Sequence, residues 1–151
     1  MSPKDICEIA DGTREGDKLA AQEAFATLGR VAGAAISTAV TLIDGLVVIG
    51  GGVSATHHWI MPAMLAEMRS KLRTLSGDEV NLVQMSLYNL DDDKEFEQFA
   101  KGEVKQVKVY GEDRYVDYDC QKRVGIMLSK QGASKAVSVG AYAFALSELD
   151  K

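Results

Sequence analysis

Three consecutive glycines after an apolar run form the segment of the sequence best suited to hold a ligand. The run is Leu46–Ile49, and the residues that follow it are Gly50, Gly51, Gly52, Val53 and Ser54. A glycine has no Cβ, so a ligand can touch its backbone and the chain can adopt a positive φ. In open α/β sheets, ligands bind beyond the carboxyl ends of strands, and N–H groups at the start of a following helix suit phosphate. The pattern indicates a ligand-contacting turn, although three glycines alone also fit a tight turn that binds nothing.

The segment matches neither of two common phosphate-binding patterns. It lacks the last glycine of G-x-G-x-x-G, and it does not have the spacing G-x-x-x-x-G-K-[ST]. Its interpretation therefore depends on the elements around it.

The remaining candidate groups form no site that the sequence reveals. Cys7 and Cys120 give neither a disulfide framework nor a metal-ligand spacing. His57 and His58 have no third ligand near them in the sequence, and zinc sites use at least three protein ligands. Asp11–Thr13 superficially resembles a phosphate segment but follows no apolar strand, so we interpret it as a helix-ending turn. We expect no bound metal in this chain.

Apolar spacing predicts two helices before the glycines. A short helix begins at Pro3, after the N-cap residue Ser2, and a long amphipathic helix runs from Asp17 to about Ile43. Gly29 and Gly33 leave one face of the long helix without bulky side chains, which predicts close packing against another backbone.

After the glycines, helical and strand patterns alternate. The run Leu46–Ile49 predicts a strand covered on both faces, in a parallel or mixed sheet. Apolar spacing then predicts a helix from Met61 to Leu75, with Pro62 in its first turn. The further predicted elements are a strand over 80–87, a short helix through Phe96 and Phe99, a hairpin of 104–109 with 115–118, a strand over 124–128 and a last helix after 131–134. Such alternation argues for the α/β class.

Composition excludes several classes of function. The 151 residues carry 17 Lys+Arg against 22 Asp+Glu, a net charge of −5 with a pI of about 5.0. Phosphate binding by nucleic-acid and anionic-membrane proteins depends on a Lys/Arg surplus, so we expect no nucleic-acid partner and no membrane partner. The longest run without Asp, Glu, Lys, Arg or His, Val31–Ile43, is too short to span a bilayer. We expect a cytoplasmic protein.

The order of these motifs resembles the C-terminal portion of ROK-family sugar kinases, which include bacterial glucokinases and fructokinases as well as sugar-responsive repressors. The resemblance covers about 1–87 and 123–150, and its matching segments are Glu15–Ala20, Asp44–Ser54 and Val139–Ala141. It implies a ribonuclease H-like, actin-like ATPase half-domain with a mixed sheet packed by long helices. It also implies that Gly50–Gly52 lie against the adenosine of a nucleotide. The segment 88–122 departs from the family pattern and is interpreted as an inserted hairpin region within one domain, 1–151.

The resemblance also implies what this chain lacks. The family's catalytic Asp, its Asp-x-Gly-x-Thr segments, its sugar-binding residues and its cysteine-rich zinc motif have no counterpart here, so we assign no catalytic residue. We expect a fragment that is inactive alone, from an enzyme that uses ATP with Mg²⁺ and phosphorylates a hexose. The sugar itself is not specified.

Three interpretations stay open at this stage: a piece of a sugar kinase, the effector-binding end of a ROK-type repressor, or an α/β ligand-binding module whose glycines are structural. In the first, the sheet is expected to have an unpaired edge and exposed apolar surface, which favours a homodimer.

Overall fold

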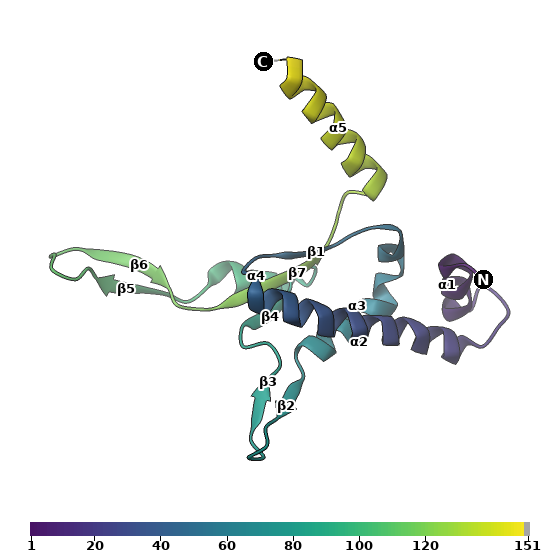
Figure 1. The fold of residues 1–151 in the computed structure, drawn as a ribbon, viewed down its shortest axis with the longest axis horizontal. Coiled ribbons are helices and arrows are strands. Elements are labelled where there is room, and N and C mark those ends of the chain that lie inside the picture. The colour runs from purple at the N-terminus through teal and green to yellow at the C-terminus, as the bar shows by residue number, and fades with distance from the viewer. Residues whose placement is uncertain (150–151) are drawn as a thin grey trace.

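The computed structural model describes residues 1–149 and places a small sheet against two long helices (Figure 1). The helices are α1 (Pro3–Asp11), α2 (Lys18–Leu42), the 3₁₀ helix η1 (Gly52–Thr56), α3 (His57–Met68), α4 (Asp93–Lys101) and α5 (Ala133–Leu149). The strands are β1 (Val47–Ile49), β2 (Lys71–Arg73), β3 (Glu79–Asn81), β4 (Ser86–Asn89), β5 (Val104–Lys108), β6 (Tyr115–Asp119) and β7 (Arg123–Leu128). The α/β class predicted from the sequence is confirmed.

The main sheet has the strand order β1-β7-β4, and both neighbouring pairs are parallel. The last strand is therefore the central one. Val47 lies opposite Ile126 on one side of β7, and Leu87 lies opposite Val124 on the other. Within residues 1–149, β1 and β4 have no further strand partner, as the sequence led us to expect.

One face of this sheet is covered by α2 and α3. The buried residues of this core are Val40, Met61, Met64, Leu65, Met68, Val83, Val124 and Ile126. Gly29 and Gly33 allow α2 and α3 to approach closely, because a Cβ at Gly29 would overlap the carbonyl oxygen of Ile60 and one at Gly33 would lie 2.7 Å from that of Met64. The predicted close packing on this glycine face is confirmed.

The other face of the sheet is largely open, so the prediction that Leu46–Ile49 is covered on both faces was wrong. Val48 on this face is 55% exposed. From this side α4 packs on β4, through the ring contact of Tyr88 with Phe99. An apolar run thus identified the strand correctly but not the number of covered faces.

The helix predicted from Met61 to Leu75 was also placed wrongly. It begins earlier, at His57, and ends at Met68, so Pro62 is its sixth residue rather than part of its first turn. Leu72 instead pairs with Val80 in the exposed β2–β3 hairpin. The helical spacing of apolar residues, every three or four positions, continues through Leu72, although this residue lies in β2, where the side chains are exposed.

The predicted strand over 80–87 is two short strands, β3 and β4, separated by a segment that places Val83 in the core. The predicted short helix is confirmed as α4, with Asp92 as its N-cap. The predicted hairpin is confirmed as β5 and β6, which project from the sheet (Figure 1). Of the region 88–122, Tyr88 and Asn89 belong to β4 in the main sheet.

A second, smaller apolar cluster joins α1 to α2 and α3. Its buried residues are Ile9, Ala10, Ala21, Phe25 and Ile60. The Gln22 side-chain amide also donates a 3.0 Å hydrogen bond to the Ala10 carbonyl. At the start of α1, Ser2 and Asp5 form a reciprocal capping box, which confirms the helix start predicted from Ser2 and Pro3.

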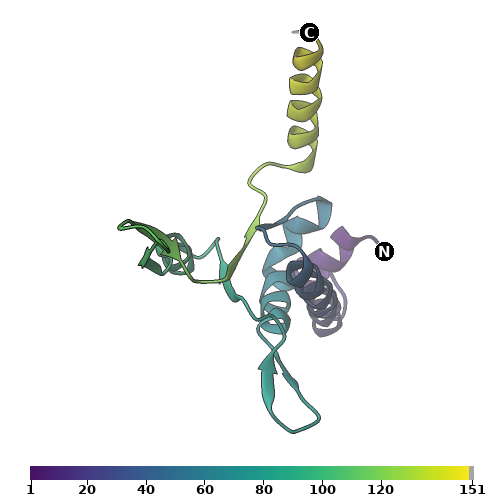
Figure 2. The same cartoon turned by 60° about the vertical axis from the view of Figure 1, so that its left-hand side comes forward.

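The helices α2 and α5 keep much apolar surface exposed. By length and composition alone α2 is long and apolar enough to cross a membrane, and 28% of its apolar window is buried by the rest of the chain. Figures 1 and 2 show α5 projecting away from the other elements. Its side chains Tyr142 and Phe144 are each 68% exposed. Both helices therefore present exposed apolar faces.

Candidate functional site

The carboxyl ends of the three parallel strands gather their following loops at one edge of the sheet. The Ser129 N–H, just after β7, donates to the Ile49 carbonyl of β1 at 2.8 Å. On the other side of β7, Asp91 Oδ2 accepts a 2.8 Å hydrogen bond from the Leu128 N–H. The loop after β1 and the loop after β7 therefore leave the sheet side by side, which is the position where open α/β sheets bind ligands.

The three glycines after β1 leave their backbone accessible. Gly50, Gly51 and Gly52 are all exposed. A Cβ on Gly50 would meet Ser129 at 3.4 Å, whereas one on Gly51 or Gly52 would meet nothing within 4 Å. Gly51 has a φ of +99°, which side-chain-bearing residues adopt only with strain. The segment is thus an open backbone surface and not a packed turn.

The two other predicted site residues lie directly after the glycines in η1. Val53 is 41% exposed, and the backbone of Ser54 continues the same 3₁₀ helix, while its side chain lies outside what the structure describes. Thr56 ends η1 and donates its hydroxyl back to the Val53 carbonyl at 2.7 Å. The five predicted residues therefore form one continuous segment between β1 and α3.

Sequence reasoning missed the loop after β7 and the residue Asp91 as neighbours of this segment. Gly132, just before α5, repeats the order of strand, glycine and helix seen after β1, and this was the available signal. The contact of Asp91 with β7 carried no comparable signal, because it depends on the strand order.

A groove of about 790 Å³ lies elsewhere, between the end of α2, the β2–β3 hairpin and the segment 118–123. None of the five predicted residues lines it. The geometry therefore supports an open surface at the glycines that could contact part of a ligand, and residues 1–149 do not enclose the rest of it.

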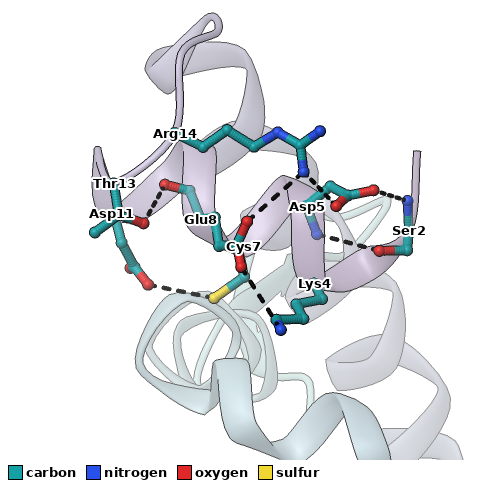
Figure 3. Close-up of polar contacts among 8 residues, drawn as sticks. All are labelled: Ser2, Lys4, Asp5, Cys7, Glu8, Asp11, Thr13 and Arg14. Carbon is teal, nitrogen blue, oxygen red and sulfur yellow. Dashed lines mark hydrogen bonds and ion pairs between the residues drawn. The ribbon is translucent and has the colours of Figure 1, made fainter.

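A polar cluster at the junction of α1 and α3 was also missed. Asp11 Oδ1 accepts hydrogen bonds from Trp59 Nε1 at 2.8 Å and pairs with His58 Nε2 at 3.1 Å. Asp11 Oδ2 accepts from the Cys7 thiol at 3.4 Å (Figure 3). The hydrogen bonds from Trp59, His58 and Cys7 lower the pKa of Asp11 below its ordinary value. Burial, then the neighbouring carboxylates of Asp11 and Glu8, raise the pKa of the Cys7 thiol.

The comparisons with known proteins give one informative match. No protein-family profile matches the chain, and no curated protein sequence matches it. Among solved structures, the crystal structure of glucokinase from Parabacteroides distasonis ATCC 8503 matches 97% of this chain at 46% sequence identity, with a TM-score of 0.81. The chain resembles part of a glucokinase.

The match covers 39% of that glucokinase chain, so this chain spans well under half of its length. The likeness confirms the fold class as part of an actin-like glucokinase fold. It also relates the chain to a carbohydrate kinase.

Proposed function

We propose that this chain is the C-terminal, nucleotide-contacting part of an ATP-dependent sugar kinase of the ROK type. The observation that carries the proposal is the open backbone of Gly50–Gly52 at the carboxyl end of β1, in a chain that resembles part of a glucokinase. In the proposed complex, these glycines, with Val53 and Ser54, contact the adenosine of ATP. The proposal places the protein in the cytoplasm, where ATP and free hexoses meet.

The chain's own residues bind and orient the nucleotide in this proposal. The positive φ of Gly51 turns the backbone away from β1, and the missing side chains allow a flat base and ribose to lie against the main chain. Mg²⁺ enters with ATP as part of the substrate, and phosphoryl transfer depends on positioning and on charge stabilisation. Asp91, a carboxylate at this sheet edge, already accepts a hydrogen bond from the Leu128 N–H, so we assign it no metal role.

Titration with ADP tests the nucleotide site. We expect the amide resonances of Gly50–Ser54 to shift at millimolar ADP, and we expect Gly51→Ala to weaken binding by about tenfold or more, because its methyl group occupies the contact surface. Gly77→Ala is the matched control: Gly77 also has a positive φ, +93°, and open space around it, but it lies in the β2–β3 turn. Equal loss in both variants, or no shift at millimolar ADP, contradicts the site and favours glycines that only shape a turn.

An activity assay tests the second part of the proposal, that residues 1–151 do not phosphorylate a sugar by themselves. A coupled assay with ATP and a panel of hexoses is expected to show no phosphorylation by residues 1–151, since we assign no base and no sugar site to them. Adding the remaining part of a related glucokinase as a separate chain is expected to restore activity if the two parts associate. Robust turnover by residues 1–151 alone contradicts the proposal.

A further inference from the structure

The cluster at the junction of α1 and α3 holds the three kinds of side chain that bind zinc-like ions. Cys7, Asp11 and His58 each offer one ligand atom, and these atoms all lie within 4.8 Å of one another. The His58 Nε2–Asp11 Oδ1 distance is 3.1 Å, and the Cys7 Sγ–Asp11 Oδ2 distance is 3.4 Å. Tetrahedral zinc, at about 2.0–2.3 Å from each ligand, separates its ligand atoms by about 3.3–3.6 Å. The two distances run to different oxygens of Asp11, and the three ligand atoms lie within about 1.5 Å of the separations that a tetrahedral ion requires.

The two helices hold these ligands in place without a metal. Cys7 and Asp11 are four residues apart in α1, so they lie on the same helix face. His58 is the second residue of α3, and the buried contact of Ile9 with Ile60 and Phe25 fixes one helix against the other directly beside it. A site on two packed helices is preorganised in a way that a site on loops is not.

The surroundings also suit a cation. Within residues 1–149, the only ion pair of Asp11 is with His58, so no lysine or arginine neutralises this carboxylate. Glu8 adds negative charge near the thiol, which is partly offset by its ion pairs with Lys4 at 3.8 Å and Arg14 at 3.6 Å (Figure 3). Trp59 donates its indole N–H to Asp11 Oδ1 and so helps to orient the carboxylate, as partners of metal ligands commonly do.

We infer that Cys7, Asp11 and His58 form a binding site for a divalent cation of the zinc class, with water in the fourth position. Sulfur, imidazole and carboxylate together favour zinc over magnesium or calcium, which prefer oxygen ligands. Asp11 and His58 are partly exposed, which leaves room for the water and for exchange of the ion. When the ion binds, the Cys7 S–H proton is released to solvent and a sulfur–metal bond forms, so no oxidant or reductant is needed.

The inference replaces the sequence-based expectation of a chain without metal. That expectation considered His57 and His58 with their neighbours in sequence, whereas the ligands on α1 lie 47 or more positions away. A bound ion would hold the start of α3 in place. Because α3 directly follows η1, the ion would also hold the end of the segment that begins at Gly50.

Zinc titration of the 151-residue chain tests the site, with Trp59 as a built-in probe because it is the only tryptophan. We expect one equivalent of Zn²⁺ to change the Trp59 fluorescence and to raise the melting temperature. We expect Co²⁺ to give a thiolate-to-metal charge-transfer band, and binding to release a proton and strengthen with rising pH. Cys7→Ser, Asp11→Asn and His58→Gln are each expected to weaken binding by more than about a hundredfold, beyond the roughly 10–100-fold loss that follows from mutating an outer-shell partner.

Matched controls are available for two of the three ligands. Cys120→Ser removes the other thiol, which is exposed between β6 and β7, and His57→Gln removes the neighbouring imidazole. Both are expected to keep one-to-one binding, and circular dichroism confirms that each variant folds. The absence of stoichiometric Zn²⁺ binding overturns the inference. So does binding that survives Cys7→Ser, or that falls as much in a control as in its matched ligand variant.

Discussion

Gly29 and Gly33 show at the residue scale how a missing side chain holds two helices together. Replacing either with alanine places a methyl group against backbone carbonyls of α3 that cannot move without shifting the helix. We expect each variant to lower the free energy of unfolding by about 1–3 kcal/mol, as overpacking does. Gly140→Ala in α5, where a Cβ meets nothing within 4 Å, is expected instead to raise it by a few tenths to about 1 kcal/mol through helix propensity. Urea unfolding followed by circular dichroism measures all three, and equal effects would contradict close packing.

Asp11 should make the junction of α1 and α3 sensitive to acid. Its pKa is lower in the folded chain than its ordinary value, chiefly through the hydrogen bond from Trp59 and then that from His58. A carboxyl group with a lowered pKa contributes stability at neutral pH, and this contribution is lost as the pH falls below the ordinary value and through the lowered one. Trp59 fluorescence in urea at successive pH values, without added metal, should therefore report a falling midpoint in acid. In Asp11→Asn, the urea midpoint should fall less steeply as the pH is lowered. An unchanged dependence of the midpoint on pH would contradict the role given to Asp11.

Among the elements, α3, β4 and α4 are joined through one carboxylate. Glu95 Oε2 accepts from Arg69 Nη2 and from the Asn89 N–H, each at 2.6 Å. Charge-assisted hydrogen bonds contribute about 1.5–3 kcal/mol, but both side chains of this pair are partly exposed, so we expect Glu95→Gln to cost about 1 kcal/mol. Glu97→Gln, on the exposed side of the same helix, should cost almost nothing. Thermal unfolding of the two variants provides the measurement, and equal melting temperatures would show that Glu95 does not join these elements.

The elements also show what sequence patterns can and cannot predict here. Helix α2, strand β7 and the β5–β6 hairpin were predictable because each carries a long or regular apolar period and a clear ending. The end of α3 was not, since Leu72 continues the helical period while its backbone pairs with β3. The glycine segment could be proposed as a site from the sequence because its residues are consecutive. The cluster of Cys7 with His58 was not, because packing between distant helices creates it.

At the scale of the whole molecule, the exposed apolar faces predict self-association. Val137, Tyr142 and Phe144 on α5 are all more than half exposed, and so is Val48 on the open sheet face. Apolar patches of this kind are rare on monomeric proteins. Light scattering is expected to give a mass that rises with concentration above the 16.3 kDa of one chain.

Paired substitutions locate the association surface. Tyr142→Ser with Phe144→Ser should shift the chain toward monomer, whereas Tyr110→Ser, which removes an exposed aromatic residue beyond β5, should not. A clean monomer at high concentration in the unaltered chain, or dissociation by Tyr110→Ser alone, would contradict a surface centred on α5.

The central position of β7 has a consequence for synthesis on the ribosome. Within residues 1–149, β1 and β4 pair only with β7. Val47 and Leu87 therefore have no strand partner until the ribosome has released the nascent chain beyond Ile126. The pair α2–α3 can dock earlier, because its contacts lie within the first 68 residues. Translation should therefore yield a helical intermediate first, and the sheet should close in a single late event around the strand that is made last.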